Sequence, residues 1–197
     1  MYRFNKNTNL YRKNINSFLD INDYNNFMRF HEQKILHTWY GCSIQKIEKE
    51  ILIDNNSLQN FKDVINLFLT SDGGKNGKWL IQPFNGKKTY SWFTSRLRFP
   101  SNKLKIIKNI FNNNKISYLF KGAIETNNEG LSNIFCNLLQ YPFLLKGSDI
   151  EIFNMETPTV IILNRHFTID IITLNENLIK DFVSLIDKDK FLIKRYK

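Results

Sequence analysis

The sequence predicts an α+β fold in which helices are interspersed along a mostly antiparallel sheet. Runs of β-branched and aromatic residues follow one another across short turn signals, which is the pattern of hairpins. Helical stretches separate some of these runs, but without the steady strand–helix alternation of a parallel sheet. The chain has 197 residues, of which 42% are hydrophobic, enough for one domain with a real core. We therefore expect a basic N-terminal arm or short helix over residues 1–22 and a single domain over residues 23–197.

Helices dominate the expected structure of the N-terminal part. Asn9 to Leu19 has the pattern of a short helix. Asp23 has the position of a cap for a second helix, which Tyr40-Gly41 ends. Residues 44–53 fit both a helical period and a period of two, and we favour a strand there. Ser57 is the expected cap of a third helix, whose apolar stripe consists of Leu58, Phe61, Val64, Ile65 and Phe68.

A hairpin is expected in the middle of the chain, after a glycine-rich loop that begins at Gly73. Its strands cover residues 78–84 and 89–99, and Asn85-Gly86 between them is a strong turn signal. Pro100 ends the second strand, and Ser101 caps a basic helix that closes at Asn112-Asn113-Asn114. A strand over residues 116–120 and a helix over residues 129–140 follow.

The C-terminal part is expected to alternate strands and turns before a last helix. Strands are predicted over residues 149–153, 159–163 and 167–174, each rich in isoleucine, valine or threonine. A helix over residues 177–186 comes next. The chain then ends in a basic tail, Lys194-Arg195-Tyr196-Lys197.

The surplus positive charge of this chain lies in its centre. The chain has 28 Lys and Arg against 18 Asp and Glu, a net charge of +10. Between Gly73 and Ile124 there are eleven basic residues and no Asp or Glu. Residues encoded by A/T-rich codons (Asn, Ile, Lys, Phe, Tyr) are abundant in this chain. Such a codon bias would add lysines throughout the sequence, but it would not remove Asp and Glu from one region. A cationic stretch rich in aromatic rings is typical of surfaces that hold an anionic, flat-faced partner.

The strongest candidate site lies on the predicted strand from Thr89 to Phe99. Alternation places Tyr90, Trp92, Arg96 and Arg98 on one face, with two rings able to stack on a base and two guanidinium groups able to bind phosphate. The alternative interpretation is that the two rings are core aromatics and the arginines are simply solvated. The predicted nucleic-acid or anion-binding residues are Lys78, Trp79, Lys87, Lys88, Tyr90, Trp92, Arg96, Arg98 and Lys103.

These features favour a non-enzymatic binding protein whose partner is a polyanion, and RNA or single-stranded nucleic acid is the polyanion that we expect. The sequence has no helix-turn-helix, zinc-finger or RNA-recognition signature, so the prediction depends on charge and aromatic content. One alternative is a protein-interaction module of the antagonist or immunity type that docks onto an acidic partner. Another is a pocket or lyase for a small anionic ligand such as a tetrapyrrole or a lipid.

No catalytic residue, cofactor or metal is predicted. The loop that ends in Lys78 is followed by Trp79 and lacks the spacing and the Ser or Thr of a P-loop. His166, Thr168 and Asp170 share one face of a predicted strand, and His-x-Thr is half of a two-histidine phosphoesterase site, but the second half is missing. A zinc site is not expected either, because His31 and His37 do not share a helical face.

The remaining signals concern compartment and family. Cys42 and Cys136 lack disulfide or metal spacing, and the chain has neither a membrane-length apolar run nor an export signal. We therefore expect a reducing intracellular compartment, the cytoplasm or an organelle stroma; a basic, acid-free N-terminus is also compatible with organelle targeting. Phe30-His31-Glu32 followed by Trp39-Tyr40-Gly41 resembles the entry into some lipocalin-like barrels of the phycobiliprotein-lyase kind, over about a dozen positions, and we assign no function from it.

Overall fold

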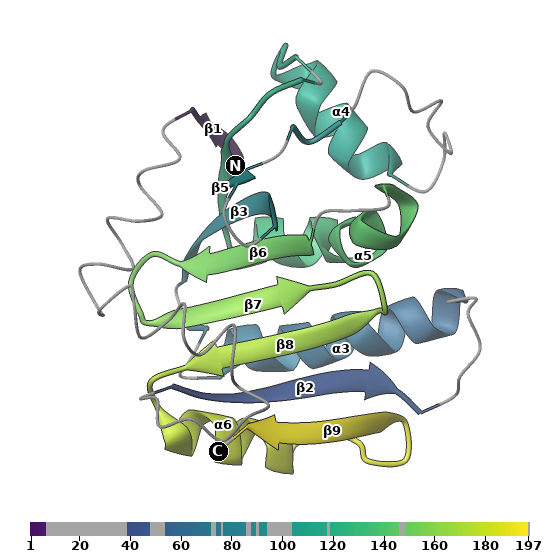
Figure 1. The fold of residues 1–197 in the computed structure, drawn as a ribbon, viewed down its shortest axis with the longest axis vertical. Coiled ribbons are helices and arrows are strands. Elements are labelled where there is room, and N and C mark those ends of the chain that lie inside the picture. The colour runs from purple at the N-terminus through teal and green to yellow at the C-terminus, as the bar shows by residue number, and fades with distance from the viewer. Residues whose placement is uncertain are drawn as a thin grey trace.

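The fold is one antiparallel sheet with helices packed on one side of it (Figure 1). The computed structural model describes residues 1–6, 39–47, 54–71, 74–75, 77–85, 88–89, 91–93, 104–117, 119–145 and 149–196. Within these residues the elements in chain order are β1 (Arg3–Asn5), β2 (Tyr40–Lys46), α3 (Asn55–Thr70), β3 (Lys78–Asn85), β4 (Lys88–Thr89), α4 (Lys105–Asn113), β5 (Ala123–Asn127), α5 (Asn128–Leu145), β6 (Asp149–Asn154), β7 (Thr159–Leu163), β8 (Thr168–Thr173), α6 (Glu176–Ser184) and β9 (Phe191–Tyr196).

The sheet has nine strands in the order β1-β5-β3-β6-β7-β8-β2-β9, with β4 paired to β3, and each pairing is antiparallel. This confirms the predicted α+β class. The order starts at β1 and ends at β9, so among the described strands the sheet is open, unlike the barrel suggested by the short family resemblance. No helix of the described residues is both long enough and apolar enough to span a membrane.

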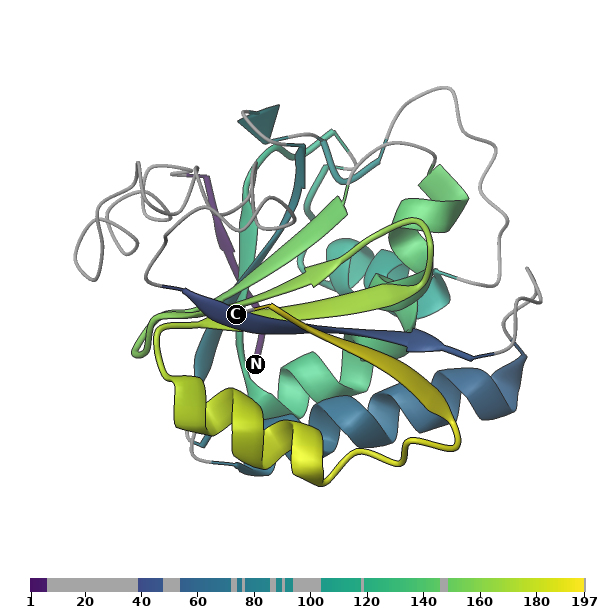
Figure 2. The same cartoon turned by 60° about the horizontal axis from the view of Figure 1, so that its bottom comes forward.

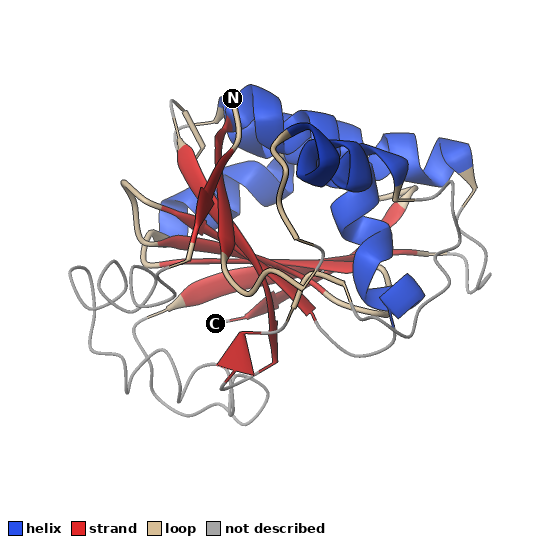
Figure 3. Cartoon of the chain, turned by 90° about the horizontal axis from the view of Figure 1, so that it is seen from above, coloured by secondary structure: helices blue, strands red, loops and turns tan. Residues whose placement is uncertain are grey.

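The main core lies between the helices and the sheet face that they cover (Figure 3). Residues on this face include Ile81, Ile152, Ile161 and Ile171, all fully buried. Asp54 caps α3, its side chain accepting a hydrogen bond from Ser57 N at 2.7 Å, one turn before the predicted cap Ser57 itself. The predicted apolar stripe of α3 is buried apart from Leu58, which is half-buried. The amphipathic pattern thus correctly predicted which side of the helix faces the sheet.

The N-terminus of α4 is capped from a neighbouring helix. Leu104 occupies its N-cap position and makes no side-chain cap bond. Instead, the buried Asn137 of α5 accepts a hydrogen bond from Ile106 N at 3.1 Å, which satisfies a backbone donor that would otherwise be left without a partner. The predicted cap, Ser101, lies outside the described residues. This contact fixes α4 against α5.

The opposite face of the sheet carries a second apolar cluster and, beside it, a polar row. Leu80, Phe153, Val160 and Ile172 are successive cross-strand neighbours in the apolar cluster. Two residues further along the strands, the register places Gln82, Glu151, Ile162, Asp170, Ser43 and Lys194 in a single row. On this face of the sheet, an apolar row therefore lies next to a row that is mostly polar.

Gln82 in this row leads to a stability prediction. It is 1% exposed, and within the described structure neither atom of its side-chain amide has a hydrogen-bond partner. A buried amide without partners opposes folding, so replacing Gln82 with methionine is expected to raise the free energy of unfolding by about 1–2 kcal/mol. Urea denaturation, monitored by circular dichroism, measures the free energy of unfolding of the variant and of the parent. As a control, Thr159→Val removes a buried hydroxyl that does bond to Thr173, at 3.4 Å, and should not stabilise. A Gln82→Met variant less stable than the parent would contradict the prediction.

Three predictions about the elements were wrong. Residues 191–196, expected to end in a basic tail, form the edge strand β9, which pairs with β2 along its whole length. Residues 116, 117, 119 and 120, which the structure describes, do not form the predicted strand: Ile116 N donates to Phe111 O at 2.9 Å and closes the end of α4, and the next described strand starts at Ala123. Arg3–Asn5, expected to be part of an arm, forms the edge strand β1 and pairs with β5. The helices expected before residue 39 lie outside the described residues.

Candidate anion-binding surface

Trp79, one of the predicted anion-binding residues, belongs to the core. It lies on β3 and is 0% exposed. Its indole Nε1 donates to Asn128 Oδ1 at 2.6 Å, and the same Asn128 amide donates to Leu69 O at 3.1 Å and Gly74 O at 2.7 Å. Asn128 therefore joins β3, the end of α3 and the start of α5. A ring held in this way is not available to a ligand.

Trp92 is held in the core as well. It is 0% exposed, and its Nε1 donates to Gly122 O at 2.9 Å. The buried Tyr141 hydroxyl donates to Trp92 O, and burial raises the pKa of Tyr141 far above its usual range, so it remains a neutral donor. Phe93 is also buried, at 1% exposed, so strict strand alternation does not continue through this pair. These positions match the alternative that the sequence left open, that of core aromatics.

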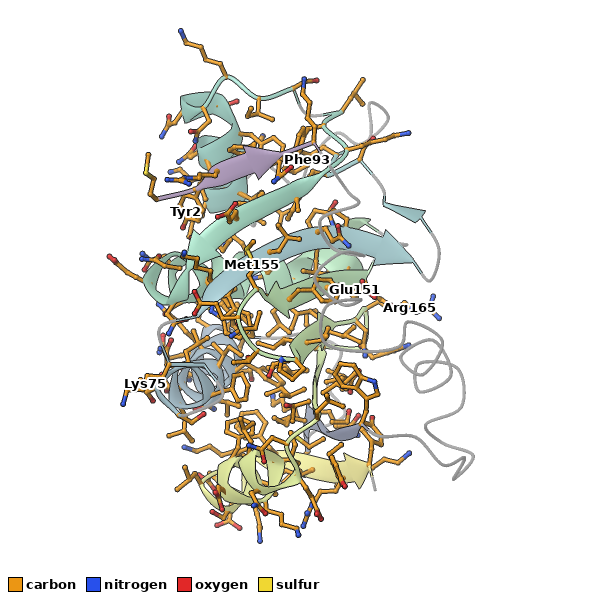
Figure 4. The ribbon with its side chains drawn as sticks, turned by 90° about the vertical axis from the view of Figure 1, so that its left-hand side faces the viewer. Tyr2, Lys75, Phe93, Glu151, Met155 and Arg165 are labelled. Atoms are coloured by element: carbon orange, nitrogen blue, oxygen red, sulfur yellow. The ribbon has the colours of Figure 1, made fainter. Side chains whose placement is uncertain are left out.

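The predicted cations do not all lie at one place. Lys78, at the start of β3, lies 3.9 Å from Glu156 in an exposed ion pair. Lys75 lies beside the end of α3 (Figure 4), in a loop where Gly74 N and Lys75 N both donate to Ser71 O. These two backbone donors are therefore not free to bind a phosphate. Lys88 lies opposite Asn85 in the β3–β4 pair, so strands pair across the predicted turn, but β4 is only two residues long and residues 91–93, inside the strand predicted over residues 89–99, lie outside any named strand. The other predicted site residues, Lys87, Tyr90, Arg96, Arg98 and Lys103, lie outside the described residues.

Sequence reasoning missed a grouping of cations at the β1 edge of the sheet. The chain has a basic, acid-free stretch before Asp20 and another between Gly73 and Ile124. Pairing of β1 with β5 brings them together, and Phe4 of β1 contacts Phe111 of α4 at a ring-centroid distance of 5.1 Å. We call the combined surface the basic end; its cations are Arg3, Lys6, Lys105, Lys108, Lys115 and Lys121.

The basic end is open to solvent. Five of its six cationic side chains are exposed, and Lys108 is half-buried. The carboxylate closest in register is Glu125, which lies opposite Arg3 on the neighbouring strand. The rings beneath this surface, Phe111 and Phe120, are buried. Among the described residues, the surface therefore offers positive charge but no exposed ring from the central stretch. The acid-free composition before Asp20 was the only sequence signal that could have included Arg3 and Lys6.

The histidine pattern does not form the arrangement predicted for a strand. His166 is exposed in the turn between β7 and β8, its backbone N donating to Asn164 Oδ1 at 2.9 Å, and the strand begins only at Thr168. Arg165 Nε lies 3.3 Å from His166 Nε2, whereas Asp170 accepts a hydrogen bond from the Tyr196 hydroxyl at 3.3 Å. Asp149 lies close to this group: burial, then the Asp170 charge, raise its pKa, while Arg165 and His166 lower it.

The cysteines lack the features of a metal site or a nucleophile. Both are free; Cys42 is fully buried, and burial, with a smaller effect of Asp170, raises the pKa of its thiol to about 12. Such a thiol stays protonated at neutral pH and is a poor nucleophile and metal ligand. Over the residues that can be described, no group of three His, Cys, Asp or Glu side chains is placed to hold a metal ion. His31 and His37 lie outside those residues.

Cys42 leads to a prediction about alkaline stability. In the unfolded chain its thiol ionises near 9, and in the folded protein near 12. Between these values the unfolded state has lost the proton and the folded state retains it, so stability falls as the pH rises through this window. Urea unfolding at a series of pH values is expected to show a smaller decline for Cys42→Ala than for the parent. An identical decline in both proteins would contradict this assignment.

Comparison of the chain with protein-family models, with curated proteins and with solved structures found no match.

Proposed function

We propose that this protein binds a polyanion, RNA or single-stranded nucleic acid, at its basic end and does not catalyse a reaction on it. The observation that carries the proposal is the pairing of β1 with β5, which joins two acid-free stretches of the chain in one exposed surface. Summed charge of one sign over a surface attracts a polyanion and raises its local concentration. The anchoring of Phe4 against α4 supports a fixed spacing of these cations.

The chemistry of the basic end favours contacts to phosphate rather than to bases. Lysine side chains act as point charges that neutralise phosphates and release counterions, so affinity depends strongly on salt. Trp92, one of the two rings expected to stack on a base, is buried, and so is Trp79. We therefore expect binding that tolerates changes of base sequence and weakens steeply with salt.

The test is a titration of labelled single-stranded RNA, followed by fluorescence anisotropy, at several salt concentrations. Each phosphate contact on a single strand contributes about −0.7 to the slope of log K against log salt. In a Lys115→Gln, Lys121→Gln double variant, the slope of log K against log salt is expected to be less steep by about 1.4, because two phosphate contacts are lost. The matched control is Lys180→Gln with Lys188→Gln, two exposed lysines around α6, which should leave the slope unchanged.

Two results would count against the proposal. One is the absence of binding at low salt. The other is an equal loss of affinity in the two double variants, because binding would then depend on net charge and not on the basic end. Binding of an acidic protein that competes with RNA only through the same two lysines would instead favour the protein-interaction alternative.

A further inference from the structure

A groove lies at the other edge of the sheet, lined by α3 and by the connection from α6 to β9. Figure 2 shows this connection running beside α3. It consists of two adjoining hollows of about 330 Å³ and 250 Å³, both lined by Asn60, Lys190 and Phe191. We call it the α3–β9 groove. In the sheet order it belongs to the β9 edge, whereas the basic end belongs to the β1 edge, so the two surfaces are separate.

One stripe of α3 lines the groove along its length. Asn56, Asn60, Asp63 and Leu67 follow one another at helical spacing and all contribute to the lining. From Asp54 to Leu67 the helix rises about 20 Å. That length matches about six residues of extended chain.

The two hollows differ in character, and each is bordered by an exposed apolar residue. The smaller hollow is lined by Val64, Leu67 and Leu185, the last 59% exposed. The larger is mostly polar but includes Ile47, which is 49% exposed. Exposed apolar side chains beside a hollow with a polar rim are typical of an interaction site.

The charge of the lining is opposite to that of the whole chain. The groove includes four carboxylates and two lysines, in a protein with a net charge of +10. Lys190 is paired with Asp187 at 3.3 Å, so these two charges offset each other, and the excess of carboxylates over lysines comes from the remaining groups. The carboxylates are Asp54, Asp63, Asp187 and Asp189. A complementary occupant therefore carries basic side chains.

We propose that the α3–β9 groove docks a short, extended, basic segment of a partner protein, with an apolar side chain of that segment in the hollow beside Leu185. The mixed lining supplies an apolar anchor point and acidic groups along a single track, which is how a linear peptide is recognised over a few residues. This inference does not depend on the polyanion proposal, because it uses a different surface and a partner of opposite charge.

The test uses synthetic peptides of about six residues, which span the length of α3 that lines the groove. The first has two leucines at one end and two lysines at the other. A second has glutamates in place of the lysines, and a third has alanines in place of the leucines. Fluorescence anisotropy is expected to give a dissociation constant on the order of 10–100 μM for the first peptide and about tenfold weaker binding for the other two.

A pair of leucine variants locates the binding site. Leu185→Gln is expected to weaken the first peptide about tenfold. Leu119→Gln, at a leucine that is equally exposed (58%) but close to the basic end, should have no effect. Both positions are solvent-exposed, so circular dichroism should show that both variants remain folded. Amide chemical-shift changes on peptide addition are expected in α3 and in residues 185–191.

The proposal is overturned if the glutamate peptide binds as well as the lysine peptide, if no peptide binds saturably, or if the two leucine variants behave alike. It is also overturned if light scattering shows concentration-dependent self-association that Leu185→Gln abolishes. In that case the occupant of the groove is a second copy of the chain.

Discussion

Replacing Trp92 with alanine is expected to lower the free energy of unfolding by about 3–5 kcal/mol, because it leaves a large cavity in the core. The indole is 0% exposed and contacts the rings of Phe111 and Tyr141 at centroid distances of 5.8 and 5.6 Å. Its removal also deprives Gly122 O of its donor. Urea denaturation followed by far-ultraviolet circular dichroism measures the loss, and a near-parental midpoint would mean that the ring is not part of the core.

Trp92→Phe separates the structural role from the binding role first expected of this residue. Phenylalanine retains much of the ring packing but loses the volume of one fused ring and the hydrogen bond to Gly122 O, which together should cost about 1–3 kcal/mol. At a temperature where this variant is fully folded, its affinity for single-stranded RNA should equal that of the parent. A loss of affinity of about tenfold, without unfolding, would restore the base-stacking role.

The C-terminal half was the most predictable part of the fold. The strand predicted over residues 159–163 has those bounds, and β6, β8 and α6 differ from their predicted ranges by at most a few residues at an end. Local chemistry determines these elements: Asn154 Oδ1 accepts from Glu156 N and Thr157 N in one turn, and Asn175 caps α6. Signals of this kind lie within a few residues of the element that they define.

The failures have non-local causes. Lys194 and Arg195 indicate a solvated tail when only neighbours in sequence are considered, yet β9 exists because β2 offers it a free edge more than 140 residues earlier in the chain. Similarly, the strand pattern over residues 116–120 was outweighed by closure of α4. The secondary structure of both segments depends on contacts with residues elsewhere in the chain, and strand propensity alone does not predict those contacts.

The candidate site was predictable in composition but not in position. The sequence located the excess charge correctly, because the absence of acids is a local property. It did not show that β1 pairs with β5, which adds Arg3 and Lys6 to the surface, or that Lys78 pairs with Glu156 elsewhere. It also could not distinguish a buried ring from a stacking ring: aromatic residues serve both purposes, and only the partners of Trp79 and Trp92 decide between them.

Replacing Asn128 with alanine is expected to cost about 3–5 kcal/mol, an effect comparable to that of Trp92→Ala although far fewer atoms are removed. One amide side chain satisfies three groups: the indole N–H of Trp79 and the carbonyls of Leu69 and Gly74. Without it, the buried indole N–H has no acceptor, and the carbonyls of Leu69 at the end of α3 and of Gly74 in the loop that follows each lose a donor. Thermal and urea denaturation should both detect the change.

The neighbouring asparagine provides a matched control. Asn127 Oδ1 accepts a single hydrogen bond, from Gly130 N at 3.0 Å, at the start of α5, so Asn127→Ala should cost only about 1 kcal/mol. Asn128→Asp is the sharper test. Its carboxylate can still accept from Trp79, but it faces the carbonyls of Leu69 and Gly74 with an acceptor where a donor is needed, so it should be at least as destabilising as alanine. If aspartate is tolerated, the amide does not join these elements, and the fixed position of β3 against α3 and α5 must come from apolar packing alone.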